Sequence, residues 1–391
     1  MPWHAHKRRT TNRQGDAMPT TTRAAVLWGD HQDWKVEDMT LDDPGPGEVL
    51  VEMAYAGMCH SDEHVVTGDM PVPFWPFVGG HEGSGVVTQV GAGVTHVAVG
   101  DHVSMAFMPA CGHCKSCSTG QQNLCDEGFK LFDLQMMTRS EGERSHTIGD
   151  SEAARFAQLG TFSEKILVSQ DSLVRVEPDL PMDVVALVSC GVATGVGSAV
   201  HRAEVRAGHN VAVVGIGGVG INAVQGAAIS GAKRVIAVDP VEFKREKAME
   251  MGATHTYSSV EEALLAVPEL TWGEMCDSVI MTPGVITGDM VEPALNLVSK
   301  GGRLVVTALN GMLENDVQLN LFMLAMMNKS VLGTVFGSGN PRADIPELLS
   351  MYREGVLDLD GLITNRYSLE DVNQGYQDLR DGKNIRGVIE F

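Results

Sequence analysis

The sequence predicts an α/β fold in which a doubly wound parallel sheet is inserted into a second, strand-rich domain. From about residue 208, apolar segments such as NVAVVG and KRVIAVD alternate with helical segments, as in a parallel sheet. Residues 23–56 instead alternate apolar and polar positions, as half-buried strands do. Beyond about residue 336 the chain returns to mixed helices and strands and ends in NIRGVIEF. Both flanks are therefore expected to build the second domain.

Composition excludes several classes of protein. The 391 residues allow two domains, and 50 acidic against 29 basic residues give a net charge of −21. This charge argues against nucleic acid or an anionic membrane as a partner. No apolar run reaches the roughly 18 residues of a membrane span. Residues 1–22 are polar, lack the apolar segment of a signal peptide, and are interpreted as a disordered N-terminal extension with Met18 as an alternative start. We expect a cytoplasmic protein.

A glycine-rich turn follows the first strand of the inserted region. Gly215, Gly217 and Gly220 form a GxGxxG pattern between a strand and a helix. The first glycine permits a tight turn, the second lets a pyrophosphate approach the backbone, and the third lets the helix pack on the strand. Asp239 ends the next strand, nineteen residues beyond Gly220, where an acid binds the adenosine ribose hydroxyls. Because the carboxylate of Asp239 would repel a 2′-phosphate, this residue predicts NAD rather than NADP.

Four of the seven cysteines lie within fifteen residues: Cys111, Cys114, Cys117 and Cys125. Four thiolates can complete a tetrahedral zinc shell, and such a closed site is structural. Iron–sulfur ligation and free structural cysteines are the alternatives.

Cys59, His81 and Cys190 offer a second ligand set of two thiolates and one imidazole, typical of a catalytic zinc with an open fourth position. Each residue alone also has an ordinary interpretation as a core residue. The seventh cysteine, Cys276, lies beside a strand and is interpreted as a buried apolar residue.

The motifs GMCHSDEH, GGHEGSG, the cysteine cluster, CGVATG, GIGGVG and GKNIRGVIEF occur in one order along the chain. In this order the sequence resembles the zinc-containing alcohol dehydrogenases of the medium-chain dehydrogenase/reductase superfamily, from about Arg23 to Phe391. The resemblance implies a catalytic GroES-like domain at 23–191 and 336–391, with a structural zinc lobe at 108–126. It also implies an NAD-binding Rossmann domain at 192–335, and two zinc ions per subunit.

The resemblance also assigns residues to the catalytic zinc. It implies that Cys59, His81 and Cys190 bind this zinc. Glu82 matches a carboxylate that can become a transient ligand, and Asp62 matches the carboxylate that orients the ligand histidine.

A proton path follows from the same resemblance. Ser61 matches the hydroxyl that takes the proton of the alcohol, and His64 matches the histidine that passes it to solvent. The other positions that the resemblance implies are His60 and Arg386 at the pyrophosphate, Thr194 and Val219 at the nicotinamide, Lys244 near the adenosine, and Phe107 and Met70 on an apolar pocket wall.

Three segments resemble a narrower branch of this family, the actinobacterial nitrosoaniline-dependent alcohol dehydrogenases associated with the redox cofactor mycofactocin. These segments are GDMPVP, FMPACGHCKSCSTGQQNLCD and VDPVEFKREKAMEMGATH. The branch implies oxidation of a primary alcohol to its aldehyde, with a tightly bound, non-exchangeable NAD that an external acceptor such as a mycofactocin-type carrier reoxidises.

Two alternatives remain open at this point. One is a thiol-dependent formaldehyde dehydrogenase acting on an S-hydroxymethyl adduct, and the other is a non-enzymatic zinc- or NAD-binding protein. We also expect a homo-oligomer, a dimer in preference to a tetramer, because the long segment Glu127–Gln158 resembles the dimeric forms and suits a subunit contact or pocket rim.

Overall fold

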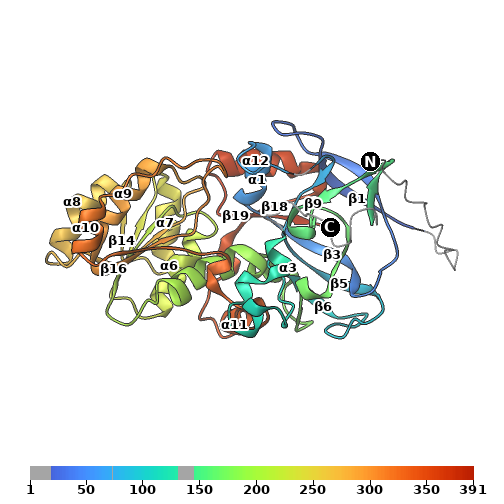
Figure 1. Ribbon diagram of the computed structural model, residues 1–391, viewed down its shortest axis with the longest axis horizontal. Helices are drawn as coiled ribbons and strands as arrows, with labels where there is room; N and C mark the ends of the chain where they lie inside the picture. The colour runs from blue at the N-terminus through green and yellow to red at the C-terminus, as the bar shows by residue number, and fades with distance from the viewer. Residues whose placement is uncertain (1–18, 73, 131–144) are drawn as a thin grey trace, which may run out of the picture.

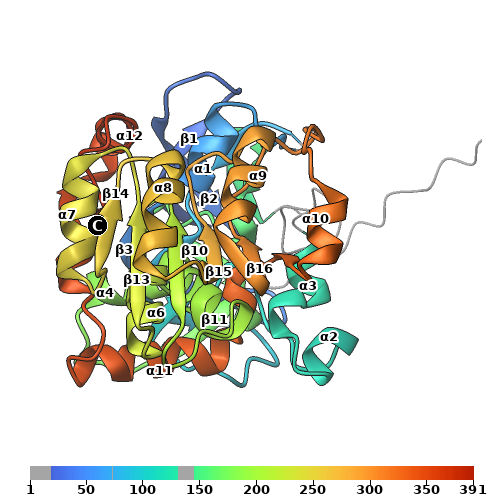
Figure 2. The same ribbon diagram turned by 90° about the vertical axis from the view of Figure 1, so that its left-hand side faces the viewer.

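The computed structural model describes residues 19–72, 74–130 and 145–391. Figure 1 shows two lobes side by side. One lobe holds the middle of the sequence, in yellow and orange, and the other combines the first part of the chain with its last strands. Figure 2 looks onto the first of these lobes, where a sheet is flanked by helices.

The middle segment forms a fully parallel six-stranded sheet with the order β14-β13-β12-β15-β16-β17. This is the doubly wound order, in which the first strand lies centrally and the chain winds outward to both sides. All five residues of β12 are buried, as expected where helices cover both faces of a sheet. The predicted Rossmann fold is confirmed. The elements are β12 (Asn210–Val214), α6 (Gly220–Ile229), β13 (Arg234–Val238), α7 (Glu242–Glu250), β14 (His255–Tyr257), α8 (Val260–Leu270), β15 (Cys276–Met281), α9 (Gly288–Leu297), β16 (Val298–Val306), α10 (Leu321–Met326) and β17 (Ser330–Gly333).

The strand-rich lobe contains two further sheets, with the orders β8-β7-β2-β1-β4-β9 and β11-β6-β5-β3-β19-β18, and β10 also pairs with β3. The C-terminal strand β19 pairs antiparallel with β3, so the end of the chain completes a sheet begun by its first part. The strands are β1 (Thr20–Leu27), β2 (Lys35–Leu41), β3 (Glu48–Met58), β4 (Phe77–Val78), β5 (Glu82–Val90), β6 (His102–Met105), β7 (His146–Ile148), β8 (Ser151–Glu152), β9 (Ala154–Arg155), β10 (Lys165–Ser169), β11 (Leu173–Val176), β18 (Ile363–Tyr367) and β19 (Arg386–Glu390).

Helices connect the two lobes. The stretch Met182–Arg202 is continuously helical and passes through two π-helical turns. It is long and apolar enough to cross a membrane, but 89% of its most apolar window is buried, as in a core helix. The domain boundary predicted between residues 191 and 192 falls inside this stretch, so no loop separates the domains there. The remaining helices are α1 (His60–Val66), α2 (Lys115–Ser118), η1 (Gln122–Leu124), α3 (Asp126–Phe129), η2 (Phe156–Gln158), η3 (Gln170–Ser172), α4 (Met182–Leu187), η4 (Val188–Val192), α5 (Ala193–Gly197), η5 (Ser198–Arg202), η6 (Phe336–Ser338), α11 (Pro341–Arg353), η7 (Asp360–Leu362), η8 (Leu369–Asp371) and α12 (Val372–Arg380).

Two predictions fall on the margins of the described chain. The extension predicted for residues 1–22 is wrong at its end, because β1 begins at Thr20 and pairs it with Leu41. Threonine favours strands, and the buried Thr22 hydroxyl accepts the backbone N–H of Lys165 at 2.9 Å. Residues 1–18 lie outside the described residues. Of the segment 127–158, residues 131–144 also lie outside them, and the described parts form α3, η2 and short strands.

Candidate active site and metal centres

Four buried side chains from three separate elements meet in one cluster, which we call the two-cysteine cluster: Cys59, His81, Glu82 and Cys190. Their ligand atoms all lie within 4.8 Å of one another. Cys59 caps the start of α1, His81 immediately precedes β5, and Cys190 sits in the π-helical turn η4. Such turns are frequent at functional sites because they re-aim one side chain of a helix. The structure therefore brings together the three residues predicted to bind the catalytic metal.

His81 is oriented from behind by Asp62 of α1. Its Nδ1 lies 3.2 Å from Asp62 Oδ2, and Asp62 Oδ1 accepts the backbone N–H of Gly80 at 2.7 Å. Against the effect of burial, the Asp62 carboxylate raises the pKa of His81 well above its ordinary value. His81 Nε2 is buried and has no hydrogen-bond partner among the residues that the structure describes. An orphaned imidazole nitrogen beside two thiols fits a zinc ligand whose other nitrogen is held by a carboxylate.

The thiols of Cys59 and Cys190 lie close enough to affect each other's pKa. A hydrogen bond from the Cys190 thiol lowers the pKa of Cys59 well below its ordinary value. The thiolate is the form that binds a metal, so one ligand of the cluster is already in its binding form.

Glu82 is paired with Arg386 at the edge of the cluster. Arg386 Nη2 donates to Glu82 Oε2, and the backbone N–H of Gly191 donates to Glu82 Oε1 at 3.0 Å. Arg386 also lies against Gly218 of the glycine-rich turn, where a Cβ would overlap its side chain. One buried arginine thus spans the two-cysteine cluster and the turn. The sequence analysis missed both Gly218 and the ion pair with Glu82.

The glycine-rich turn has the geometry expected of a phosphate cradle. Gly215 has a φ of +91°, which favours glycine, and a Cβ on Gly220 would overlap the Gly215 carbonyl. By contrast, nothing lies within 4 Å of a Cβ built on Gly217, which leaves room where a pyrophosphate approaches the backbone. Val219 caps α6, so the unpaired N–H groups of that helix point at the turn.

Other predicted cofactor residues line the same region. Asp239 is buried and accepts the N–H groups of Ile216 and Val241 at 2.7 and 2.9 Å, which leaves lone pairs on its carboxylate for ribose hydroxyls. Thr194 Oγ1 is buried without a hydrogen-bond partner, as expected of a hydroxyl that meets a bound group. Burial and the neighbouring His64 lower the pKa of His60, and the charge of Lys244 acts in the same direction.

The predicted proton path lies on α1. Ser61 Oγ lies 3.6 Å from Cys59 Sγ. The rings of His60 and His64 meet edge to face, with centroids 5.2 Å apart. His64 Nδ1 lies 3.2 Å from Asp69 Oδ2. The sequence analysis did not single out Asp69, although an acid in the turn just after a functional histidine is a local signal that could have found it.

Aromatic rings surround His81 on the side of the predicted pocket. The Phe107 ring lies 5.8 Å from that of His81 and 5.4 Å from that of Phe336. Phe156 lies closer, at 4.8 Å from His81, and was not predicted because it comes from a distant part of the chain. Met70 is half-buried and packs against the apolar cluster that includes Val65 of α1. The wall around His81 is therefore aromatic.

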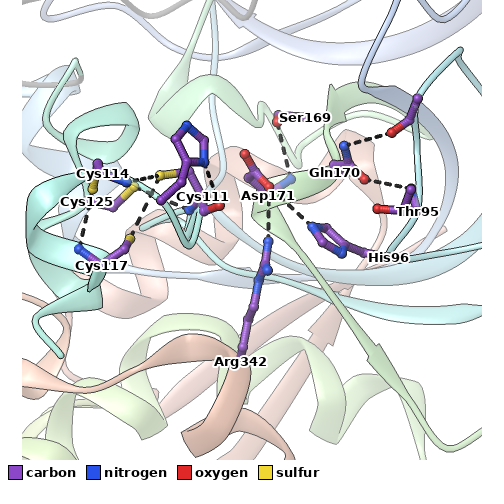
Figure 3. Close-up of polar contacts among 12 residues, drawn as sticks. Thr95, His96, Cys111, Cys114, Cys117, Cys125, Ser169, Gln170, Asp171 and Arg342 are labelled. Carbon is purple, nitrogen blue, oxygen red and sulfur yellow. Dashed lines mark hydrogen bonds and ion pairs between the residues drawn. The ribbon is translucent and has the colours of Figure 1, made fainter. Parts of the chain in front are cut away.

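The second metal centre is the four-cysteine lobe, residues 108–126. The sulfur atoms of Cys111, Cys114, Cys117 and Cys125 all lie within 4.8 Å of one another. Backbone N–H groups of Cys111, Cys114 and Cys117 each point at a neighbouring sulfur at 3.4 Å (Figure 3). Although burial opposes it, backbone hydrogen bonds lower the pKa of Cys114 to about 7. Four converging sulfurs stabilised by N–H donors fit a closed, structural zinc site.

Asp171 anchors this lobe to the rest of the molecule. Its carboxylate accepts Arg342 Nη2 of α11 at 3.0 Å (Figure 3). Its carbonyl accepts the N–H of Ala110, next to Cys111, at 3.0 Å. The seventh cysteine, Cys276, is fully buried in β15, and burial raises its pKa to about 12. Its interpretation as a buried apolar residue fits this position.

The two-cysteine cluster can hold a metal ion, and Arg386 contacts both this cluster and the glycine-rich turn that suits a dinucleotide. This combination is typical of a zinc-dependent dehydrogenase that uses NAD(P). Comparisons agree with this class. Residues 45–178 match the family described as "Alcohol dehydrogenase GroES-like domain", and residues 218–354 match "Zinc-binding dehydrogenase". The chain belongs to the zinc-dependent alcohol dehydrogenases of the medium-chain dehydrogenase/reductase family. It is an oxidoreductase, so the non-enzymatic alternative is wrong.

The chain is also similar to individual alcohol dehydrogenases over nearly its whole length. The chain is 50% identical over 368 residues to the "NDMA-dependent alcohol dehydrogenase" of Amycolatopsis methanolica, covering 94% of this chain and 98% of the relative. It is 47% identical over 370 residues to "Alcohol dehydrogenase B" of Mycobacterium tuberculosis, covering 95% and 98%. The crystal structure of benzyl alcohol dehydrogenase from Acinetobacter calcoaceticus superposes with a TM-score of 0.87 at 29% identity, covering 95% of this chain and 99% of that one.

Proposed function

We propose that this enzyme oxidises a primary alcohol to its aldehyde, with NAD held tightly in place and reoxidised by an external acceptor. The observation that carries the hydride transfer is the position of Arg386, in contact with both Glu82 of the two-cysteine cluster and Gly218 of the glycine-rich turn. The external acceptor is proposed from the 50% identity to the relative described as NDMA-dependent. A hydride donor at the metal and a nicotinamide on the turn would then lie within one buried site, as direct hydride transfer requires.

The side chains present fit both groups. Cys59, His81 and Cys190 would hold a catalytic zinc, the four cysteines of the lobe a structural zinc, and the turn with Thr194 and Asp239 the dinucleotide. A bound zinc lowers the pKa of a coordinated hydroxyl, and bound NAD accepts hydride. Asp62 keeps His81 in the tautomer that ligates, and Glu82 with Arg386 supplies a charge-balanced wall. The acid at 239 favours NAD over NADP.

The proton of the alcohol has a proposed route along α1. Ser61, beside Cys59, would accept the proton, and His64, on the same helix, would pass it on toward solvent. The side chain of His64 is 4% exposed. His60, whose pKa is lowered by burial, would offer a ring N–H to the pyrophosphate, and Lys244 would supply positive charge on the adenosine side.

The substrate class follows from the rings at His81. Phe107, Phe156 and Phe336 form an apolar wall that suits an alkyl or aryl tail and carries no ionisable group. The relative of similar structure from Acinetobacter is described as a benzyl alcohol dehydrogenase, which agrees with such a tail. We propose a primary alcohol with an apolar substituent.

The test uses protein purified without added dinucleotide. We expect about one NAD per chain to remain bound, and a panel of primary alcohols to be oxidised with a nitrosoaniline dye as acceptor but poorly with free NAD. Turnover with free NAD alone would contradict the tightly bound cofactor. Activity only on formaldehyde mixed with a thiol would favour the S-hydroxymethyl adduct as substrate instead.

We further propose a homodimer formed through the outer edge of the parallel sheet. β17 ends the strand order, and no residue of the adjacent helix α10 is buried. Its Leu321 and Phe322 are 69% and 70% exposed, which is unusual for a monomer's surface. Strand pairing between the β17 edges of two copies would cover both the open edge of the sheet and the exposed side chains of α10. Two identical edges related by a two-fold axis pair antiparallel, so a second copy of the chain is a suitable partner.

Light scattering tests the dimer. Phe322→Asp is expected to yield monomers, whereas the matched control Leu265→Asp, at an 85% exposed apolar position on α8, should leave a dimer. A wild-type monomer would contradict the proposal.

A further inference from the structure

His64, the proposed last member of the proton route, is almost enclosed by protein. Its side chain is 4% exposed, while that of Asp69, 3.2 Å away through Nδ1, is 34% exposed. Of this pair, the carboxylate is the member that reaches solvent. A carboxylate that accepts Nδ1–H fixes the tautomer of the ring and leaves the lone pair on Nε2, where a proton can be taken up.

The charges around His64 are arranged asymmetrically. His60, whose ring is 5.2 Å from that of His64, lies on the same helix, and Lys244 of α7 acts on His60. Cys59 and Glu63 are the other titratable groups that act on His60 in this pocket. Glu63 is itself paired with Arg380 of α12, with 2.6 Å between Oε1 and Nη1. Asp69 is the acidic side chain that lies within hydrogen-bond distance of the His64 ring.

Asp69 is held in place by more than His64. The Thr67 hydroxyl donates to Asp69 Oδ2 at 2.7 Å, and the Asp69 carbonyl accepts the N–H of Met312 at 3.0 Å. Met312 follows β16 of the parallel sheet, so the turn that carries Asp69 touches both lobes. The hydrogen bond from Thr67, with that from His64, lowers the pKa of Asp69, which keeps it ionised at neutral pH.

We propose that Asp69 is a positioning residue for proton release: it orients His64, stabilises its protonated form, and opens the route to solvent. The inference rests on the proposed function, because it assigns a partner to the histidine of the proton route. In each turnover His64 Nε2 would gain the proton of the alcohol, the Asp69 carboxylate would balance the positive charge, and the ring would then lose one proton to water and return to the Nδ1–H form. No bond other than N–H and O–H bonds forms or breaks in this step.

The experiment measures single-turnover reduction of the enzyme's NAD by a primary alcohol as a function of pH. In the wild type the rate should rise with pH to a plateau, because the alcohol must lose its proton before hydride leaves. Asp69→Asn keeps the size of the side chain but removes the negative charge that faces His64 Nδ1. We expect the rising limb to move to lower pH and the plateau rate to fall roughly 10-fold. The affinity for alcohol and the melting temperature should stay unchanged.

Two further variants make the outcomes distinguishable. Asp30→Asn removes an acid next to the same turn, 3.6 Å from a Cβ built on Gly68, and should behave as the wild type. His64→Gln should be slow at all pH values and partly restored by added imidazole. If His64→Gln were slow but Asp69→Asn had the rising limb and the plateau rate of the wild type, the role of Asp69 would be overturned and the proton route through His64 would stand. If the rate of His64→Gln matched that of the wild type at every pH, the proton route itself would be overturned, and the role of Asp69 with it.

Discussion

Replacing Cys59 with serine should abolish alcohol oxidation while the protein stays folded. Serine keeps the shape of the side chain but supplies no thiolate, and a site of three protein ligands loses zinc when one is removed. The two-cysteine cluster consists of a few buried side chains on elements that belong to the larger fold, so the protein should stay folded when the cluster loses its metal. We expect turnover at background level, with zinc content falling by about one ion per chain. Metal analysis, activity and a thermal melt check this together.

The matched control is Cys276→Ser, which changes an equally buried cysteine in β15 that lies outside both metal clusters. It should keep both zinc ions and its activity, with at most a modest loss of stability. His81→Ala should behave as Cys59→Ser does. Near-normal activity of either ligand variant would refute the assignment of this cluster.

Cys114→Ser should instead cost stability. In the four-cysteine lobe Cys117, Asn123 and Cys125 are the buried residues between Cys111 and Cys125, and α2 is only four residues long. A lobe with so little core depends on its metal for its fold. A loss of about 3 kcal/mol would lower the melting temperature by roughly 6–12 °C for a domain of 150–250 residues. Calorimetry and zinc analysis measure both effects.

Lys115→Ala is the control for the lobe, since Lys115 is exposed, lies next to Cys114 and is not a ligand. It should melt and bind zinc like the wild type. If Cys114→Ser kept a full zinc complement and the wild-type melting temperature, the lobe would not be a structural metal site. Residual activity in the soluble fraction of Cys114→Ser is expected, because the catalytic ligands are untouched.

Much of the fold could be predicted because buried parallel strands leave a plain signal. β12, β13 and β15 are runs of apolar residues bounded by glycine or polar turns, and the glycine-rich turn follows β12 directly. The short spacing of the four cysteines predicted their cluster, whereas Cys59, His81 and Cys190 are far apart in sequence and were grouped by their ligand chemistry and by the family resemblance. The start of β1 was misjudged because its three threonines are polar, and polar residues next to an extension carry no pattern of their own.

The parts that could not be predicted depend on contacts between distant segments. Arg386 and Glu82 are 304 residues apart, and nothing local to either one indicates the ion pair. Phe156 reaches His81 through a turn with positive φ at Ala157 and Gln158, held by hydrogen bonds of Arg155 to the carbonyls of Gln158 and Leu167. Such packing is decided by tertiary structure and has no periodicity in the sequence.

The central claim is that hydride passes from an alcohol at the two-cysteine cluster to the nicotinamide of a dinucleotide whose pyrophosphate is held by the glycine-rich turn. The most direct measurement is the absorbance of reduced nicotinamide after a primary alcohol is mixed with the zinc-loaded enzyme without an acceptor. We predict about one equivalent of reduced cofactor and of aldehyde per chain, and neither product with Cys59→Ser loaded with the same dinucleotide. Oxidation of the alcohol without reduction of the nicotinamide, or equal reduction by Cys59→Ser, would contradict the account.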